Sequence, residues 1–590
     1  MESSLKAWIR ALERTASIEE YPFRTFPVLI ETLAAEHGAA VALSSPKTTL
    51  TYAQLSEYAN RIARWGLARG LAKGDVVCLL MPNRPEYLAI WIGLSRLGVT
   101  IALLNTQLSG SALAHCIAAA APRITIADAR LENALDSAEP HLPTKIESWI
   151  FGGESKQRPQ LDDVSSKLDS GPVAPEECAY PSLRDPALYI YTSGTTGLPK
   201  AARVSHLRIM QWTHWFAGMM QVTDQDRMYN CLPLYHSVGG VVAAGATLVG
   251  GGAVILRERF SAREFWNDVV SEHCTLFQYI GELCRYLLAN RSQPLETQHR
   301  LRLCCGNGLR AEVWQPFQER FRIPNILEYY AATEGNFSLY NCEGRIGSIG
   351  KIPAFLAHRL PVALVRFDVF SEMPIRNDEG RCLRCSVGEI GEALGQISDG
   401  KDRSIGRFEG YADSAATDRK ILRDVFEQGD AWYRTGDLMR HDAEGFYYFA
   451  DRIGDTFRWK GENVSTTEVT ATVLACDGVV DAAVYGVRVA GFDGRAGMTA
   501  VAVHDGFDLR KLKAHLEKQL PEYARPVFIR IVSSIDLTGT LKLNKQLLAT
   551  QSFDPNQSQD PLYYVDRNSG AFLPLTVDVF RQLQAGLQRI

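Results

Sequence analysis

The sequence predicts an α/β fold of more than one domain, and three observations support this. A chain of 590 residues is too long for a single hydrophobic core. Apolar strand patterns alternate with helix patterns in the first part of the chain, which predicts right-handed crossovers and a parallel sheet. From residue 346 to residue 451 the pattern changes to glycine-punctuated strands, and a small mixed domain follows.

The composition is that of an ordinary globular protein, with 46% hydrophobic and 22% charged residues. The net charge of −4, from 63 basic and 67 acidic side chains, gives no indication of nucleic-acid binding. Twelve cysteines follow no regular spacing, and no signal-peptide pattern is visible. We therefore predict a reduced, cytoplasmic protein, and leave open peripheral contact with the inner face of a membrane.

Residues 1–24 predict an amphipathic helix. Its apolar and basic side chains fall on opposite sides of a helix, with Leu5, Trp8, Ile9 and Leu12 against Lys6, Arg10 and Arg14. Such a helix either lies in a membrane interface or packs on its own domain. We favour packing, because the segment is short and also carries acidic residues.

The stretch from residue 236 to residue 256 contains no Asp, Glu, Lys or Arg, and it includes six glycines. A single membrane span and a buried strand and helix would both fit this composition. We favour buried packing, because the preceding residues 229–233 have the pattern of a turn.

The alternating pattern begins with a hairpin over residues 40–52, in which Ser45-Pro46-Lys47 forms the turn. Thr51 and Gln54 have the spacing of a capping box for the next helix, which ends at Gly70. The following segments predict strands over 76–81, 99–105 and 124–128, and helices opened by Asn83 and spanning 109–121. Residues 162–181 are polar, contain proline and predict a linker.

A loop rich in glycine and hydroxyl side chains follows the apolar strand pattern of residues 187–190. It reads Tyr191, Thr192, Ser193, Gly194, Thr195, Thr196, Gly197, Leu198, Pro199 and Lys200. Glycines let the backbone approach a ligand, while N–H groups, hydroxyls and a lysine are the groups that hold a polyphosphate. The order is not that of a Walker A loop. The alternative is a surface turn, but a strand, glycines, hydroxyls and lysine in this order favour a phosphate site.

This decapeptide resembles the signature loop of the adenylate-forming superfamily, which includes acyl-CoA synthetases, luciferases and nonribosomal peptide adenylation domains. Residues 275–290, 306–310 and 451–465 are similar to the fatty acid transport protein and very-long-chain acyl-CoA synthetase branch. The resemblance covers most of the chain. It implies a large N-terminal domain, residues 1–452, of two parallel-sheet α/β subdomains plus a distorted β-barrel. A small mobile α+β C-terminal domain, residues 453–590, would follow.

The resemblance also implies which residues bind the nucleotide. Tyr330 would stack on adenine, Thr333 would contact phosphate, and Asp437 would accept from the ribose hydroxyls. Arg452 would contact phosphate or ribose. The implied set is Tyr191, Thr192, Ser193, Gly194, Thr195, Thr196, Gly197, Lys200, Gly306, Asn307, Gly308, Tyr329, Tyr330, Thr333, Asp437 and Arg452.

The implied metal ligands are Thr192 and Glu334, since a carboxylate beside a triphosphate requires a hard cation such as Mg²⁺. The implied catalytic residues are Lys542, His236, Thr333 and Glu334. His236 would lie beside the substrate carboxylate, and Lys542 would bridge that carboxylate and the α-phosphate. Lys545 stays open as an alternative to Lys542, because the spacing around this lysine varies between branches.

Small side chains follow His236 in the sequence, from Ser237 to Ala246. In the resembling family the helix here lines an acyl tunnel, and small residues would leave room for a long, unbranched chain. The alternative is tight helix packing.

On the coenzyme A side, the resemblance implies Arg458, Lys460, Gly461, Glu462 and Asn463. These residues would reach the site when the small domain turns near Gly454. Many relatives carry Asp or Lys at this pivot, and glycine can also absorb a large change in φ and ψ.

The function implied is ATP-dependent ligation of a long- or very-long-chain fatty acid to coenzyme A through an acyl-adenylate, releasing AMP and pyrophosphate. Fatty acid, ATP and coenzyme A would be the ligands and Mg²⁺ the cofactor. Two alternatives remain: a coenzyme A ligase for a bulky sterol, bile or aromatic acid, and a membrane-associated fatty acid uptake protein. The sequence predicts no oligomeric state.

Overall fold

The computed structural model describes residues 4–174, 176–193, 199–369, 371–398, 407–460, 462–492, 494–535, 545–585 and 587. The chain forms two compact units. The first comprises Met1–Arg359 and Ile397–Ile421, and the second comprises Leu360–Gln396 and Leu422–Ile590. Each unit is described by itself.

One sheet of the first unit is parallel except for its last strand. The first five strands run parallel and β8 pairs antiparallel with β7. The order is β6 (Glu147–Phe151), β5 (Ile124–Asp128), β3 (Val76–Leu80), β4 (Thr100–Leu103), β7 (Pro186–Ser193) and β8 (Pro199–Ser205). The strands predicted at 76–81, 99–105 and 124–128 are therefore confirmed.

The second sheet of this unit is parallel between two antiparallel edge strands, β14 and β2. The β1–β2 pair is the predicted hairpin, closed by Ser45 and Thr48. The order is β14 (Ser338–Asn341), β13 (Ile326–Ala331), β12 (Leu303–Asn307), β11 (Leu276–Ile280), β9 (Arg227–Asn230), β10 (Ala253–Leu256), β1 (Val41–Ser44) and β2 (Thr49–Thr51).

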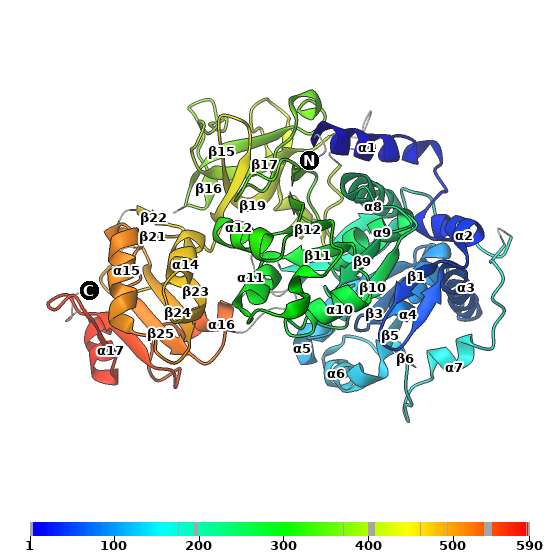
Figure 1. Cartoon of the computed structure of the whole chain (residues 1–590), viewed down its shortest axis with the longest axis horizontal. Helices are drawn as coiled ribbons and strands as arrows, with labels where there is room; N and C mark the ends of the chain where they lie inside the picture. Colours follow the sequence, from blue (N-terminus) through cyan, green and yellow to red (C-terminus); the bar gives the residue numbers. More distant parts are fainter. Residues whose placement is uncertain are drawn as a thin grey trace. The chain divides into compact units, whose positions relative to one another are not determined.

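Helices connect and cover these strands (Figure 1). The first group is α1 (Ser4–Ala16), α2 (Phe26–His37), α3 (Tyr52–Ala68), α4 (Pro85–Arg96), α5 (Gly110–Ala120), α6 (Glu132–Ala138) and α7 (Leu161–Ser165). The second is α8 (His206–Met220), α9 (Ala246–Val249), α10 (Phe265–Ser271), α11 (Gly281–Ala289), α12 (Ala311–Arg320) and α13 (Ser414–Asp418). Thr51 and Gln54 make the predicted capping box at the start of α3.

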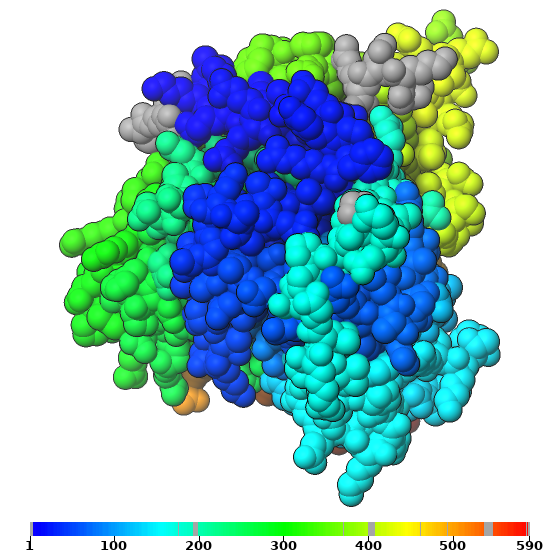
Figure 2. Space-filling model, turned by 90° about the vertical axis from the view of Figure 1, so that its right-hand side faces the viewer, coloured from blue at the N-terminus to red at the C-terminus, as the bar shows by residue number. Residues whose placement is uncertain are grey.

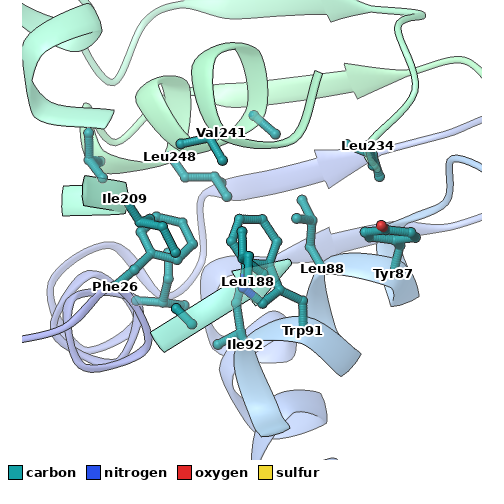
Figure 3. Packing of buried hydrophobic residues seen from close by; sticks show 14 of the residues in the cluster. Phe26, Tyr87, Leu88, Trp91, Ile92, Leu188, Ile209, Leu234, Val241 and Leu248 are labelled. Carbon is teal, nitrogen blue, oxygen red and sulfur yellow. The ribbon is translucent and has the colours of Figure 1, made fainter. Parts of the chain in front are cut away.

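The main core of the first unit joins residues from both sheets. Every residue of α4 is buried, so this helix has no solvent-facing side. Figure 3 shows its Leu88, Trp91 and Ile92 packed among side chains from other elements, including Phe26 and Leu248. Burial of this kind stabilises the unit by about 25 cal/mol per Å² of apolar surface removed from water.

The apolar stretch from residue 236 to residue 256 belongs to this core. It forms a π-helical segment, Val238–Gly245, followed by α9 and β10, and its side chains from Gly239 to Val249 are buried. Among the described residues, no helix is both long enough and apolar enough to span a bilayer.

The N-terminal helix packs on its own unit, as predicted. α1 lies along α8 (Figure 1), with Trp8 and Ala11 buried. Figure 2 shows the N-terminal residues, in dark blue, along the surface of this unit. The Trp8 ring meets Trp215 and Tyr340 edge-on, with centroids 5.8 and 5.4 Å away. Leu5 and Ile9 remain 49% and 41% exposed on the outer side of the helix.

The second unit contains two separate hydrophobic cores. The first belongs to an antiparallel sheet ordered β16 (Met373–Pro374), β15 (Val362–Asp368), β17 (Gly391–Gln396), β19 (Ala431–His441) and β18 (Ile421–Arg423), in which β20 (Tyr447–Arg452) also pairs with β19. The strand-rich, barrel-like region predicted between 346 and 451 corresponds to this sheet.

The second core belongs to a mixed five-stranded sheet, with a separate hairpin of β21 (Phe457–Trp459) and β22 (Glu462–Val464). The sheet order is β23 (Val479–Val487), β24 (Ala496–Val503), β25 (Phe528–Val532), β26 (Leu562–Val565) and β27 (Phe572–Pro574). Its helices are α14 (Thr466–Leu474), α15 (Leu509–Gln519), α16 (Gln546–Gln551) and α17 (Val577–Gln584). The predicted small α+β domain is thereby confirmed.

The contact between α1 and α8 depends on Gly218. A Cβ atom at this position would lie 2.6 Å from the Cα of Ala11, so only glycine allows this approach. We expect Gly218→Val to push α1 off α8, to destabilise the unit by about 1–3 kcal/mol and to open residues 4–20 to proteases. Lys6→Ala, on the exposed side of α1, is the control. Equal protease resistance of Gly218→Val and the unmodified chain would show that α1 is held by other contacts.

Candidate active site

The strand β7 brings Thr192 to the carboxyl end of a parallel sheet, where ligands of open α/β sheets bind. Thr192 is half-buried and lies opposite Lys200 in the β7–β8 pair. Gly194, Thr195, Thr196 and Gly197 of the predicted phosphate loop lie outside the described residues. The described part of this motif is therefore the end of β7 and the start of β8.

The side chain of Tyr191 points away from this region, because successive residues of a strand face opposite sides of the sheet. It is buried in a small core, and its hydroxyl donates to the carbonyl oxygen of Cys116 on α5 at 2.6 Å. The Tyr191 side chain is thus engaged in packing, and its predicted nucleotide contact stays a prediction. Its role is to fix β7 against α5.

Tyr411 occupies the space between the two predicted metal ligands. Its hydroxyl donates to Oε1 of Glu334 at 2.7 Å, and the hydroxyl of Thr192 lies close enough to influence the pKa of the phenol. Burial and the neighbouring Glu334 carboxylate raise the pKa of Tyr411, so the phenol stays protonated and acts as the donor to Glu334. Sequence analysis did not identify Tyr411, because nothing in its neighbourhood indicates a partner 77 residues away.

Residues 410–412 pair with β8 through an isolated β-bridge between Tyr411 and Ala202, which fixes Tyr411. Arg203 donates its N–H to the carbonyl of Gly410 at 3.0 Å, and Ala412 donates to Ala201 at 2.8 Å. Tyr411 itself is 2% exposed. The pairing places the Tyr411 ring over the end of the β7–β8 hairpin.

Lys200 lies beside the same ring. Its Nζ is 5.9 Å from the centroid of Tyr411, a cation–π distance. Burial and the nearby charges of Arg419 and Lys420 lower the pKa of Lys200, which makes an added anion favourable at this position. Lys200 therefore suits the predicted contact with phosphate.

Thr333 and Glu334 follow β13 in a loop that contacts the segment after His236. Glu334 is 9% exposed, and the Thr333 hydroxyl lies 3.0 Å from the hydroxyl of Ser237. Because Ser237 follows His236 directly, this contact brings the predicted His236 and Thr333 segments together. His236 is half-buried, and its ring lies 4.5 Å from that of Tyr235.

Arg208, on α8, links this loop to the segment that carries Tyr411. Its guanidinium donates to the carbonyl oxygens of Thr333 at 3.2 Å and Arg407 at 2.6 Å. Its Nε lies 3.8 Å from Glu409, which accepts the N–H and hydroxyl of Ser205 at 2.8 and 2.6 Å. The sequence did not indicate this role for Arg208.

The glycines after His236 are required by packing. A Cβ at Gly239 would lie 2.3 Å from the carbonyl oxygen of Pro233, and one at Gly240 would lie 2.4 Å from that of Leu234. At Gly245 a Cβ would meet Thr213 at 2.5 Å. These three positions therefore follow the tight-packing alternative, and they leave no space of their own for an acyl chain.

A buried carboxylate holds the second glycine-containing loop. Glu328 on β13 accepts the Leu309 N–H at 3.1 Å and the Tyr279 hydroxyl at 2.5 Å, and it also hydrogen-bonds the backbone of Gly308. Burial raises the pKa of Glu328 to about 8. Gly306 packs against Tyr279, where a Cβ would lie 2.3 Å from the carbonyl oxygen, so its small size has an internal reason. Asn307 is half-buried at the end of β12.

The two tyrosines after Glu328 differ in environment, again because of strand alternation. Tyr329 is 2% exposed and packs in the core, with its ring 4.7 Å from that of Phe216. The Tyr329 side chain is therefore engaged in packing, and its predicted nucleotide contact stays a prediction. Tyr330 is half-buried, 5.8 Å from the ring of Phe337, and stays a candidate for stacking on a base.

The oxygen atoms near Tyr411 suit Mg²⁺. Within the described ranges, no cluster of three or more His, Cys, Asp or Glu side chains could hold a metal ion. Mg²⁺ commonly takes one or two protein carboxylates and completes its shell with substrate phosphates and water. Glu334 and the hydroxyl of Thr192, held together through Tyr411, match this pattern.

In the second unit, the predicted ribose and phosphate residues face one another. Asp437 on β19 lies opposite Arg452 on β20, and Oδ1 of Asp437 is 3.4 Å from Nε of Arg452. Gly436 has a φ of +78°, which favours glycine, and its carbonyl accepts the Ile453 N–H at 2.9 Å. The motif therefore brings together the two side chains predicted to bind nucleotide from this unit.

The predicted coenzyme A residues lie on the β21–β22 hairpin, where Arg458 pairs with Asn463 and Trp459 with Glu462. Lys460 has a φ of +51° and forms an ion pair with Glu522 at 2.9 Å. Gly461 and Lys542 lie outside the described residues. Their predicted roles remain predictions.

Lys545 is engaged near the predicted pivot. Its Nζ donates to the Thr466 hydroxyl at 3.1 Å and lies 3.6 Å from Asp455. Asp451 accepts the N–H of the same Thr466 at 2.6 Å. Lys545 thus takes part in fixing the start of α14, which favours Lys542 over Lys545 as the lysine that reaches the substrate.

Comparison with known proteins gives consistent results. Residues 30–392 match the family model described as AMP-binding enzyme, and residues 468–542 match the AMP-binding enzyme C-terminal domain. Long-chain fatty acid transport protein 1 of Mus musculus is 39% identical over 568 residues, covering 95% of this chain and 88% of that protein.

Two solved structures share the fold. An anthranilate CoA ligase in complex with anthranoyl-AMP aligns with a TM-score of 0.76 and 22% identity, covering 89% of this chain and 96% of that one. Mycobacterium tuberculosis fatty acyl CoA synthetase aligns with a TM-score of 0.62 and 22% identity, covering 90% and 98%. The fold is therefore the same in ligases whose names give an aromatic and a fatty acyl substrate.

Glu328 predicts a dependence of stability on pH. Its pKa of about 8 in the folded chain exceeds the ordinary 4.5, so between these values the folded state binds more protons than the unfolded state. The free energy of unfolding should therefore fall as pH rises from 5 to 8, by at most about 1.4 kcal/mol per pH unit from this group. Glu328→Gln should remove this contribution.

Urea unfolding at pH 5, 6, 7 and 8 would measure the effect. The quantity compared at each pH is the difference in unfolding midpoint between the unmodified chain and Glu328→Gln. Glu312→Gln, an exposed substitution on α12, is the control and should leave the pH dependence as it is. Parallel curves for Glu328→Gln and the unmodified chain would contradict the raised pKa.

Proposed function

Since the chain belongs to the AMP-binding enzyme family, and within it to the long-chain fatty acid transport proteins, we propose that it ligates a long- or very-long-chain fatty acid to coenzyme A. The observation that carries this proposal is the similarity to relatives with that name over 95% of the chain. The reaction would consume ATP, pass through an acyl-adenylate, and release pyrophosphate and AMP.

In the first half-reaction the fatty acid carboxylate attacks the α-phosphorus of ATP and pyrophosphate leaves. Thr192 and Glu334 would hold Mg²⁺, which offsets the charge of the phosphates when bound. Lys200 would contact a phosphate, and Tyr330 would stack on adenine. The ion-paired Asp437 would accept from the ribose hydroxyls, so that nucleotide and acid meet in a fixed orientation.

Lys542 would stabilise the negative charge that develops between the carboxylate and the α-phosphate. His236, beside Ser237 and Thr333, would border the carboxylate. In the second half-reaction the coenzyme A thiolate attacks the adenylate carbonyl and AMP leaves. Residues Arg458 to Asn463 would face this step after a turn near Gly454.

An uptake role is the second candidate, and the name of the relatives favours it. Ligation and uptake are compatible, because converting a fatty acid into its coenzyme A thioester traps it on one side of a membrane. The exposed Leu5 and Ile9 of α1 are among the described apolar side chains that peripheral membrane contact could use.

The proposal predicts AMP release from the purified chain with Mg-ATP and fatty acids of increasing length, and acyl-CoA formation only when coenzyme A is added. Mass spectrometry would identify the products. Aromatic, sterol and bile acids form the comparison panel. Turnover restricted to ring acids would support the ligase activity and contradict the fatty acid substrate. No turnover with any acid would contradict the ligase activity itself.

A second prediction separates the two lysines. Lys542→Ala should lower adenylate formation by about 10²–10³-fold and affect thioester formation from supplied acyl-adenylate far less. Lys545→Ala, which loses the contacts to Thr466 and Asp455, should affect adenylate formation less than Lys542→Ala. Single-turnover assays of each half-reaction measure both effects. The reverse order would assign the catalytic role to Lys545.

A further inference from the structure

We propose that Tyr411 is a positioning residue that sets the divalent-cation affinity of the site by orienting Glu334 and Thr192 together. This inference rests on the proposed function, since it takes these two side chains as the oxygen ligands of a Mg²⁺–nucleotide complex. Tyr411 lies outside both predicted motifs, the loop that contains Thr192 and the segment that contains Glu334. Its hydroxyl group is near both.

The hydrogen bonds around Tyr411 have a fixed direction. The phenol donates to Oε1 of Glu334 at 2.7 Å, because the carboxylate can only accept. The phenol oxygen is then left as an acceptor, and the hydroxyl of Thr192 is its neighbour on the other side. If Thr192 turns its hydrogen toward this oxygen, it keeps its own lone pairs for a cation. The second oxygen of Glu334 likewise lies outside the bond to the phenol.

The backbone holds Tyr411 rigidly, so the orientation costs little further entropy when a ligand binds. The residues before and after Tyr411, Gly410 and Ala412, both make backbone hydrogen bonds to β8. The N–H of Tyr411 donates to the Thr417 hydroxyl at 2.9 Å. Gly410 has a φ of +67°, and a Cβ there would meet Thr417 at 2.5 Å, so the turn into this strand is closely packed.

The partners of Tyr411 are held equally firmly. Thr192 lies within the β7–β8 pair, opposite Lys200. The loop of Glu334 is tied through Arg208 to the carbonyl of Arg407, four residues before Tyr411. The two proposed ligands and Tyr411 are therefore held in place by one connected set of hydrogen bonds. Groups that orient metal ligands in this way typically change metal affinity or activity by about 10–100-fold when removed.

The test is Tyr411→Phe in the full chain, which removes the hydroxyl and keeps the ring. The free Mg²⁺ concentration that gives half-maximal AMP release should rise by about tenfold. The KM for ATP measured at saturating Mg²⁺ should change much less. Loss of packing alone would lower stability without moving the Mg²⁺ requirement selectively.

A binding measurement makes the test independent of turnover. A non-hydrolysable ATP analogue with a methylene group between its α- and β-phosphorus atoms should raise the unfolding temperature as free Mg²⁺ increases. Tyr411→Phe should need about ten times more Mg²⁺ for half of this shift. Tyr448→Phe is the matched control, because it removes a phenol bound to Asp442 at 2.9 Å in the second unit.

A second variant covers the case in which Tyr411→Phe unfolds. Tyr411→Met also removes the donor to Glu334, while its flexible apolar side chain can fill the space of the ring, and it should raise the Mg²⁺ requirement by a similar factor. An unchanged Mg²⁺ requirement in Tyr411→Phe, with an active unmodified chain, overturns the role of Tyr411. If the unmodified chain makes no acyl-CoA yet the Mg²⁺-dependent thermal shift moves as described, the proposed function fails and the positioning role stands.

Discussion

The candidate site depends on the pairing of residues 410–412 with β8. That segment belongs to the first unit although it follows β15 and β17 of the second unit in the chain, and its β-bridge places Tyr411 beside β8. One buried phenol then contacts Thr192 from one segment and Glu334 from another. The constraint on Glu334 is first of all geometric. Its carboxylate is oriented by the Tyr411 hydroxyl, and the backbone pairing of residues 410–412 fixes the position of Tyr411.

Close packing shapes the surroundings of the site at least as much as ligand space does. The glycines at 239, 240 and 245 permit backbone carbonyls and Thr213 to approach, and Gly306 makes room for Tyr279. A pattern of small residues is therefore an ambiguous signal, since a helix packed against a loop requires it as much as a ligand does.

Local patterns predicted the fold well, and alternation along strands explains side-chain placements that the motifs alone did not predict. The capping box of Thr51 and Gln54 and the βα alternation depend on neighbours in sequence, so they can be read from it. Tyr191 and Tyr329 belong to matching motifs, yet the strand period of two turns both rings into the core. Tyr411 could not be found, because its partners are set by a crossover between units that no local spacing encodes.

The second unit places a condition on the proposed domain movement. The buried Asp451 accepts from Thr456 at 3.0 Å and from the Thr466 N–H at 2.6 Å, so its contacts bridge the chain on both sides of Gly454. Gly454 has a φ of +92° and open space around its Cα hydrogens, which suits a pivot. A large rotation there would separate Asp451 from these two partners and leave the buried carboxylate with the Arg452 N–H, at 2.9 Å, as its remaining backbone donor, which is costly. A pivot at Gly454 would therefore require new partners for Asp451 in the rotated state, and Asp451 would be as much a part of the proposed hinge as the glycine.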